Sequence, residues 1–215
     1  MKYEKKILQR GLLIAIFLLA LYAYNVHIPD LYFDEAIYHY QAREFVEEGT
    51  SLYDTAIWTP PLFNFTTSLS FVMMGISNFS SRFLTIIAGV IAVWITFLLA
   101  RLYFNRTIST LAALLLGLSP IFVVYSRIAL FDVMLTAFSL LAIYAVEKYQ
   151  LKGKRQWLLY ASIFFALAFL TKFNAIVVWF FYWVFKICHP LIKKEIKIFR
   201  ENVQQFALIN AISAI

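Results

Sequence analysis

Long, almost uncharged stretches alternate along the chain with short segments that hold most of the charged residues. Six of these stretches approach the roughly 17–25 residues that a membrane-spanning helix needs. They cover residues 11–29, 83–100, 107–126, 128–146, 156–171 and 173–190. Residues 203–215 have the same character and resemble the beginning of a seventh. The pattern therefore predicts an all-α, polytopic transmembrane helical bundle with six complete spans and part of another.

The composition supports a membrane location. Hydrophobic residues make up 62% of the chain and charged residues only 14%, whereas soluble globular domains average about 45–50% apolar and about 25% charged residues. The formal net charge of +7 does not indicate a nucleic-acid partner, because the basic residues fall in short clusters between apolar stretches, as in the positive-inside pattern. We therefore expect a multi-pass protein of the cell membrane that contacts lipid and no nucleic acid.

The distribution of basic residues predicts the orientation. Most of the 19 lysines and arginines face the cytoplasm if the N-terminus is cytoplasmic and residues 63–77 do not cross the membrane. On this topology, residues 30–81 form one long external loop. Within the loop, residues 35–48 are expected to form an amphipathic helix that ends at Gly49. Residues 62–77 are expected to lie along the membrane surface or to re-enter it.

The external loop opens with the stretch LYFDEAIYHYQAREF, which places an adjacent acidic pair just outside the first span. The topology brings Asp34, Glu35 and Asp132 to the same face of the membrane. Two interpretations of Asp34 stay open. In the first, it is a helix N-cap whose carboxylate accepts backbone N–H groups. In the second, it is a reactive carboxylate that accepts a proton or binds a cation, with the helix dipole stabilising its charge.

Five short stretches carry a likeness to a known family. They are, in order, FDEAIYHYQARE, TPPLF, SSRFLTIIAGV, LSPIFVVYSRIALFDVML and LAFLTK. Together they resemble the GT-C membrane glycosyltransferases, especially the protein O-mannosyltransferase group and the aminoarabinose transferases that modify lipid A. The resemblance implies a GT-C-like fold with surface helices in the first external loop. It also implies transfer of a sugar from a polyprenyl-phosphate donor to a hydroxyl of a protein, lipid or glycan acceptor at the outer membrane face.

The resemblance also implies roles for the external polar residues. Asp34 matches the base that takes the proton of the acceptor hydroxyl, and Glu35 and Asp132 are further catalytic candidates. A cation is needed beside the phosphate of the donor. The candidates for contacts to substrate and phosphate are Arg127, Lys172, Arg82, Tyr38 and His39. Some relatives bind a divalent metal, for which Glu35 and Asp132 would supply oxygen ligands.

The sequence also departs from the family pattern. Trp58 and Thr59 precede the Pro-Pro where relatives often carry a histidine or lysine, and Ile37 stands where some carry an arginine, which leaves donor contacts at these positions open. Family members are much longer, so we expect little activity without further spans. A partner chain is one source that could supply these spans. A truncated, non-catalytic membrane subunit remains an alternative. A transporter is less favoured, because the span interiors carry no charged residue.

Overall fold

The computed structural model describes residues 14, 17–27, 30–49, 61–192 and 196–213. Every regular element within these ranges is an α-helix, which confirms the all-α prediction. The first helical segment covers residues 17–23. It is followed by α2 (Phe33–Glu48), α3 (Pro61–Met74), α4 (Asn78–Ala100), α5 (Arg106–Gly117), α6 (Pro120–Tyr125), α7 (Phe131–Lys152), α8 (Gln156–Thr171), α9 (Ala175–Ile192) and α10 (Ile196–Ser213).

The six-span prediction is confirmed only in part. Among the described residues, α4 is the one helix that is both long and apolar enough to cross a membrane. The helices α5 and α8, and the Ala175–Cys188 part of α9, are apolar but shorter. The 22 residues of α7 include the charged residues Asp132, Glu147 and Lys148 near its ends. Length and composition therefore support one crossing directly, and the other crossings stay a prediction.

Two predicted spans differ from the observed helices. The stretch 107–126 forms two helices, because Pro120 has no N–H to donate and its ring disfavours helical backbone at the preceding residue. That residue, Ser119, has a ψ of 126°, outside the helical region. Residues 203–213 of the expected seventh span lie inside α10, which already starts at Ile196, and residues 214 and 215 fall outside the described residues. Its first half carries Lys197, Arg200 and Glu201.

Other predicted elements match the structure closely. The apolar stretch 156–171 coincides with α8 at both ends. The amphipathic helix expected at 35–48 is α2, which ends at Gly49 with a φ of 66°. This left-handed backbone favours glycine at the end of a helix. The segment expected to lie along or to re-enter the membrane contains α3.

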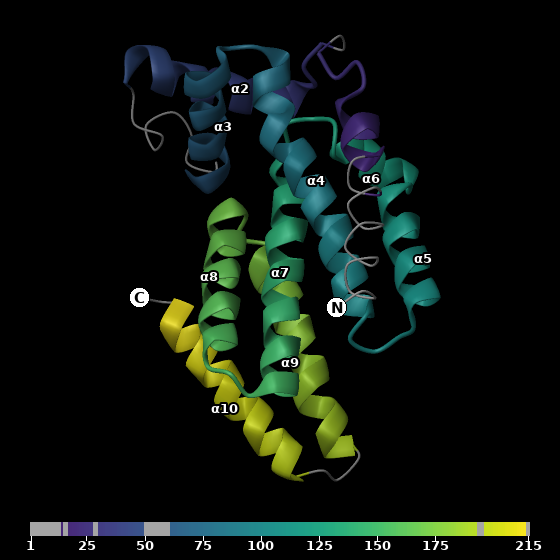
Figure 1. Ribbon diagram of the computed structural model, residues 1–215. Coiled ribbons are helices and arrows are strands. Elements are labelled where there is room, and N and C mark those ends of the chain that lie inside the picture. Colours follow the sequence, from purple (N-terminus) through teal and green to yellow (C-terminus); the bar gives the residue numbers. More distant parts are fainter. Residues whose placement is uncertain (1–13, 15–16, 28–29, 50–60, 193–195, 214–215) are drawn as a thin grey trace.

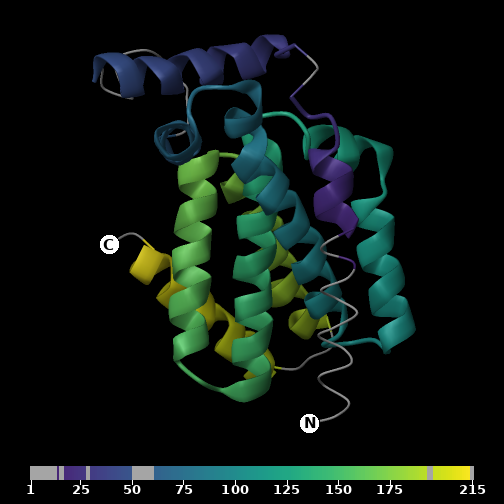
Figure 2. The ribbon, with the colours of Figure 1, turned by 45° about the horizontal axis from the view of Figure 1, so that its top comes forward.

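The helices α4, α5, α7, α8 and α9 run side by side between two ends (Figure 1). Figure 2 shows α2 lying across one of them, which we call the α2 end. There α4 and α7 begin and α8 finishes, whereas the connections from α4 to α5 and from α7 to α8 lie at the opposite end. This arrangement is compatible with the predicted topology, in which the two sets of connections face opposite sides of the membrane.

The core beneath the α2 end is built around residues 17–27, which pack against α4 and α5. Tyr22 is fully buried, and its hydroxyl donates a hydrogen bond to the Gly117 carbonyl at 2.8 Å. Leu18 and Val26 belong to the same apolar cluster as Ile86 of α4 and Val133 of α7. The apolar cluster thus fixes the end of the first helical segment beside the start of α7.

Candidate functional site

The N-terminus of α2 differs from one sequence interpretation. Tyr32, not Asp34, precedes the helix, and its backbone N–H donates to Oε2 of Glu35 at 3.1 Å. Asp34 is the second residue of the helix and is exposed. Within the described residues, its carboxylate makes no hydrogen bond or ion pair. The N-cap interpretation of Asp34 is therefore wrong, because Glu35 stabilises the start of the helix instead.

Glu35 forms a bidentate ion pair with Arg82 of α4. Nε of the arginine lies 2.6 Å from Oε1 of Glu35, and Nη2 lies 2.7 Å from Oε2. Both side chains are completely removed from solvent, with exposed fractions of 0% and 1%. Oε1 also accepts the backbone N–H of Ala129 at 2.7 Å. Glu35 therefore connects α2, α4 and the segment that leads into α7.

The rest of the Arg82 guanidinium holds the end of the first helical segment and the chain that follows it. Nη1 donates to the Val26 carbonyl, and Nη2 donates to the Asp30 carbonyl at 3.2 Å. These contacts favour a structural role for Arg82 over the predicted contact with the donor phosphate. They equally disfavour Glu35 as a catalytic group or metal ligand, since both of its oxygens already accept N–H groups in a closed interior.

Arg127, the first candidate for phosphate binding, also donates to backbone carbonyls, as Arg82 does. Its guanidinium donates to the carbonyls of Leu21 at 3.2 Å and Tyr24 at 2.6 Å. These carbonyls lie at the C-terminal end of the first helical segment, where an arginine also interacts favourably with the helix dipole. Arg127 thus anchors one segment on another, which favours a structural role over a contact with substrate.

Asp132 and Lys172 form a second ion pair, which is open to solvent. Nζ of Lys172 lies 2.7 Å from Oδ1 of Asp132, and the two side chains are 27% and 38% exposed. The same ammonium lies 4.4 Å from the ring centroid of Phe131, within the range of a cation–π contact. Asp132 is the second residue of α7, and Lys172 directly follows α8. The pair is therefore accessible, in contrast to the closed pair of Glu35 and Arg82.

Tyr38 of α2 packs against the start of α7 and against α3. Its ring packs edge-on against Phe131, with 5.2 Å between the centroids, and against Phe63 of α3 at 5.7 Å. Burial raises the pKa of the Tyr38 hydroxyl, and the negative charges of Asp34 and Asp132 raise it further. The ring of Phe131 contacts both Tyr38 and the Lys172 ammonium, and Lys172 pairs with Asp132, so Tyr38, Asp132 and Lys172 lie near one another. Asp34 lies one helical turn before Tyr38 on α2. The catalytic and binding roles of these residues stay a prediction.

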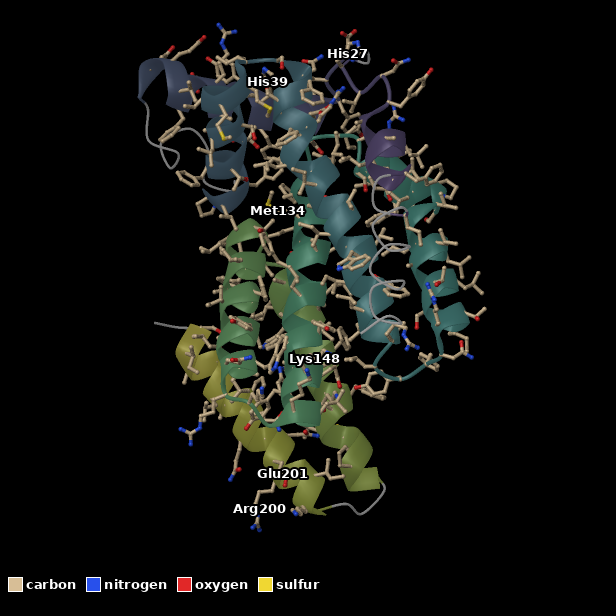
Figure 3. All side chains as sticks on the ribbon, in the orientation of Figure 1. His27, His39, Met134, Lys148, Arg200 and Glu201 are labelled. Atoms are coloured by element: carbon tan, nitrogen blue, oxygen red, sulfur yellow. The ribbon has the colours of Figure 1, made fainter. Side chains whose placement is uncertain are left out.

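His39 faces α3 and not the Asp132–Lys172 pair. Its ring packs against Phe71 of α3, with centroids 4.9 Å apart, and its Nδ1 is buried with no hydrogen-bond partner among the described residues. Figure 3 shows it at the α2 end, and it comes from the same helix as Asp34. Burial lowers the pKa of His39, Glu35 opposes this effect, and Arg43 and Arg82 add to it. A neutral imidazole between two helices is a poor partner for a phosphate, so these contacts disfavour the predicted role.

The lowered pKa predicts that acid weakens the packing of α2 on α3. Because the folded state binds a proton at His39 less readily than the unfolded chain, this contribution to stability is complete above the unfolded pKa of about 6.5. It is lost as the pH falls from there towards the lower folded pKa. We expect the melting temperature of the purified protein to fall over this pH window, and to fall less in His39→Leu. Equal pH dependence in both proteins would contradict this assignment.

The described residues contain no cluster of three or more histidine, cysteine or acidic side chains that could hold a metal ion. Of the two predicted ligands, Glu35 is enclosed by N–H donors, whereas Asp132 is accessible. The residues present therefore do not fit a metal held by Glu35 and Asp132 together.

The sequence analysis missed a second polar cluster, near the opposite end of α7. Glu147 is almost fully buried, and Lys186 of α9 lies 2.6 Å from its Oε1. The hydroxyls of Tyr182 and Tyr103 also donate to this carboxylate. Beside the cluster lies a cavity of about 1000 Å³ between α7, α9 and α10. Figure 3 shows Lys148 and Glu201 on this side, far from His39. The sequence does hint at this cluster, because Glu147 and Gln150 lie one turn apart and therefore share a face of the predicted helix.

Comparisons with known proteins identify the family. A sequence profile of the dolichyl-phosphate-mannose-protein mannosyltransferase family matches residues 59–212, which is most of the chain. The chain belongs to this family, whose members are membrane glycosyltransferases of the GT-C type. An uncharacterized protein of Aquifex aeolicus (strain VF5) is 30% identical over 172 residues, which cover 77% of this chain and 34% of that protein. The chain thus spans about a third of the length of this relative. No solved structure matches it.

Proposed function

We propose that the α2 end is the site at which a sugar passes from a polyprenyl-phosphate carrier to an acceptor hydroxyl. The observation that carries this proposal is the accessible pair of Asp132 and Lys172, which adjoins Tyr38 through Phe131 on the same helix end as the exposed Asp34. A carboxylate with no hydrogen bond or ion pair among the described residues and an accessible cation are the two groups that the transfer needs. Family membership supports the class of reaction, and the geometry supports the location.

Asp34 serves as the base in this scheme. The acceptor oxygen attacks the anomeric carbon of the sugar, and its proton passes to the Asp34 carboxylate. A bond forms between the acceptor oxygen and the anomeric carbon while the bond from that carbon to the phosphate oxygen breaks. The polyprenyl phosphate leaves with the bonding electrons. Asp34 suits this role because it is exposed at the N-terminus of α2, where the helix dipole stabilises negative charge.

Lys172 contacts the donor phosphate in this scheme. The other two cations among the sequence candidates are engaged, since Arg127 donates to backbone carbonyls and Arg82 pairs with Glu35. The ammonium of Lys172 is partly exposed and held by Asp132 and the face of Phe131. A cation fixed in this way stabilises the negative charge that develops on the leaving phosphate. Asp132 is a positioning residue, because it acts through Lys172.

The proposed topology places this site at the outer face of the membrane. The basic residues of the connections from α4 to α5 and from α7 to α8 lie at the opposite end, which faces the cytoplasm under the positive-inside rule. The N-terminus is cytoplasmic in this arrangement, and the loop 30–81 is external. The acceptor is a hydroxyl of a protein, lipid or glycan.

We predict that Lys172→Gln weakens binding of the donor. A hydrogen bond to a charged group contributes about 1.5–3 kcal/mol, which corresponds to a rise in Kd of about 10–150-fold. The measurement is binding of a radiolabelled polyprenyl-phosphate sugar to the protein in proteoliposomes. Lys154→Gln is the control, because Lys154 is an exposed lysine in the connection at the opposite end. An equal effect of the two substitutions would remove Lys172 from the site.

A further inference from the structure

The helix α3 has its polar and apolar faces reversed relative to a helix on the surface of a soluble protein. Its inward side chains include Asn64, Thr67, Ser68 and Ser70, all of which are buried. Its exposed side chains are apolar. Four of them form what we call the α3 stripe, which consists of Phe65, Leu69, Val72 and Met73, and the fifth is Met74 at the end of the helix. The spacing i, i+4, i+7 and i+8 places all four on one face of the helix.

The polar side of α3 is supplied with partners by the protein itself. Nδ2 of Asn64 donates to Oε1 of Gln41 in α2 at 2.9 Å. The hydroxyl of Ser68 lies 3.3 Å from the Ala42 carbonyl, and that of Thr67 donates to the Phe63 carbonyl at 2.9 Å. The first two bonds attach α3 to α2, and the third lies within α3. Oδ1 of Asn64 is buried with no hydrogen-bond partner among the described residues. Most polar groups on the inward side of α3 are thus bonded inside the protein, and what α3 presents to its surroundings is apolar.

The α3 stripe strongly resembles a surface in contact with lipid. Val72 and Met73 are 69% and 72% exposed, which would be unfavourable for large apolar side chains in water. The helix contains no charged residue. In a bilayer the preference is reversed, because apolar side chains face the acyl chains and polar groups must find partners inside the protein.

The neighbours of α3 place the stripe at one edge of a larger apolar surface. The helix packs against α4 and α8, and α8 ends with Phe169 and Leu170 exposed. The outward side of α2 differs, because it carries the exposed ion pair of Arg43 and Glu47 at 2.7 Å. α3 is inclined to α7 and α8: Figure 1 shows it from the side and Figure 2 nearly end-on, whereas α7 and α8 are seen from the side in both views. The change from charged to apolar surface thus falls between the C-terminal half of α2 and the stripe, whereas the N-terminal half of α2 also exposes Phe33 and Tyr40.

We infer that the α3 stripe lies in the acyl-chain region of the lipid bilayer, next to the head groups, while the charged C-terminal half of α2 stays in water. The partner is a phospholipid surface, not another protein. Through the bonds to Gln41 and Ala42, the immersed α3 would fix the height of α2, and hence of Asp34, above the membrane. This inference depends on the exposed and buried faces of α3 and does not require sugar transfer.

Spin-label accessibility tests the inference. In a Cys188→Ser background, which has no other cysteine, single cysteines at Val72 and Met73 receive a nitroxide in vesicles of phosphatidylcholine and phosphatidylglycerol. Collisions with oxygen report lipid, and collisions with a water-soluble nickel chelate report water. Labels at Ile91, an exposed position within α4, and at Glu48, at the charged end of α2, supply the lipid and water references.

We expect the ratio of oxygen to nickel accessibility at Val72 and Met73 to exceed that at Glu48 several-fold and to stay below that at Ile91, which lies in the middle of α4 and hence deeper in the bilayer. A ratio like that of Glu48 would show that the stripe faces water and would overturn the inference. Low accessibility to both reagents would show that a protein covers the stripe, which would also overturn it. Because both side chains are exposed, the labels should leave the melting temperature nearly unchanged, and this is measured in parallel.

Discussion

Replacing Asp34 by asparagine is expected to lower the rate of sugar transfer by about 10²–10⁴-fold, the range usual for the loss of a general base. Asparagine keeps the size of the side chain but cannot accept the proton of the acceptor. The fold should be retained, because the Asp34 carboxylate makes no hydrogen bond or ion pair within the described residues and Glu35, not Asp34, holds the start of α2. The rate is measured with radiolabelled lipid-linked sugar on the full-length or reconstituted enzyme, because little activity is expected without further spans, and binding of the donor should change little.

Glu48→Gln is the matched control for this substitution. It also removes one carboxylate from α2, but at the far end of the helix, where Glu48 is exposed. The control should transfer sugar at nearly the normal rate. If Asp34→Asn behaved like this control, with an unchanged melting temperature, Asp34 would be an ordinary surface residue and the proposed base would have to be sought elsewhere.

Breaking the buried pair of Glu35 and Arg82 is expected to destabilise the protein severely. Removing one partner of such a pair leaves an uncompensated charge in the interior and costs about 3–5 kcal/mol. Glu35 also accepts the backbone N–H groups of Tyr32 and Ala129, which would lose their acceptor in Glu35→Leu. We therefore expect Glu35→Leu and Arg82→Met each to lower the melting temperature strongly, or to prevent accumulation of folded protein.

A comparison with an exposed pair gives this prediction its control. Arg43 and Glu47 form an ion pair one helical turn apart, with side chains about half exposed, and such pairs contribute at most about 1 kcal/mol. Arg43→Met should therefore change the melting temperature little. The double variant Glu35→Leu with Arg82→Met should be less destabilised than the sum of the single variants, because no buried charge is left alone. Equal melting temperatures for Arg82→Met and Arg43→Met would refute the structural assignment of the buried pair.

The sequence predicts much of the helical organisation, because its signals are local. A run without charges between Arg155 and Lys172 defines α8 at both ends, and Gly49 marks the end of α2. The break before Pro120 was also available from the sequence, because proline disfavours helical backbone at the residue before it. The prediction of a single span rests on the length of the apolar run 107–126. The two observed helices, α5 and α6, are each shorter than a span.

The sequence also predicts which groups gather at the α2 end, but not their partners. Charge distribution alone placed Asp34, Asp132 and Lys172 on one side of the membrane. The sequence ranked Arg127 first and Lys172 second as phosphate contacts and could not assign a partner to any of the external cations. The structure separates them through contacts that are distant in sequence. Arg82 meets Glu35, and Arg127 meets the carbonyls of residues 21 and 24. Such pairings depend on how whole helices pack, and no local pattern encodes them.

Within the part of the chain that the structure describes, the cavity beside Glu147 is an alternative location for the transfer site. It is large, with a volume of about 1000 Å³, and polar side chains from α7, α9 and α10 line it. A buried ionisable residue in a membrane protein is often functional. However, Glu147 is already engaged by Lys186, Tyr182 and Tyr103. At the α2 end, by contrast, Asp34 and the pair of Asp132 and Lys172 are accessible.

Photoaffinity labelling separates the two locations directly. A polyprenyl-phosphate sugar that carries a diazirine next to its phosphate is incorporated into proteoliposomes with the protein, irradiated, and the labelled peptides are identified by mass spectrometry. The account predicts labelling around Phe131 and Lys172, which disappears when unmodified donor is added in excess. Labelling around Glu147 and Asn202, or labelling that excess donor does not compete away, would contradict it.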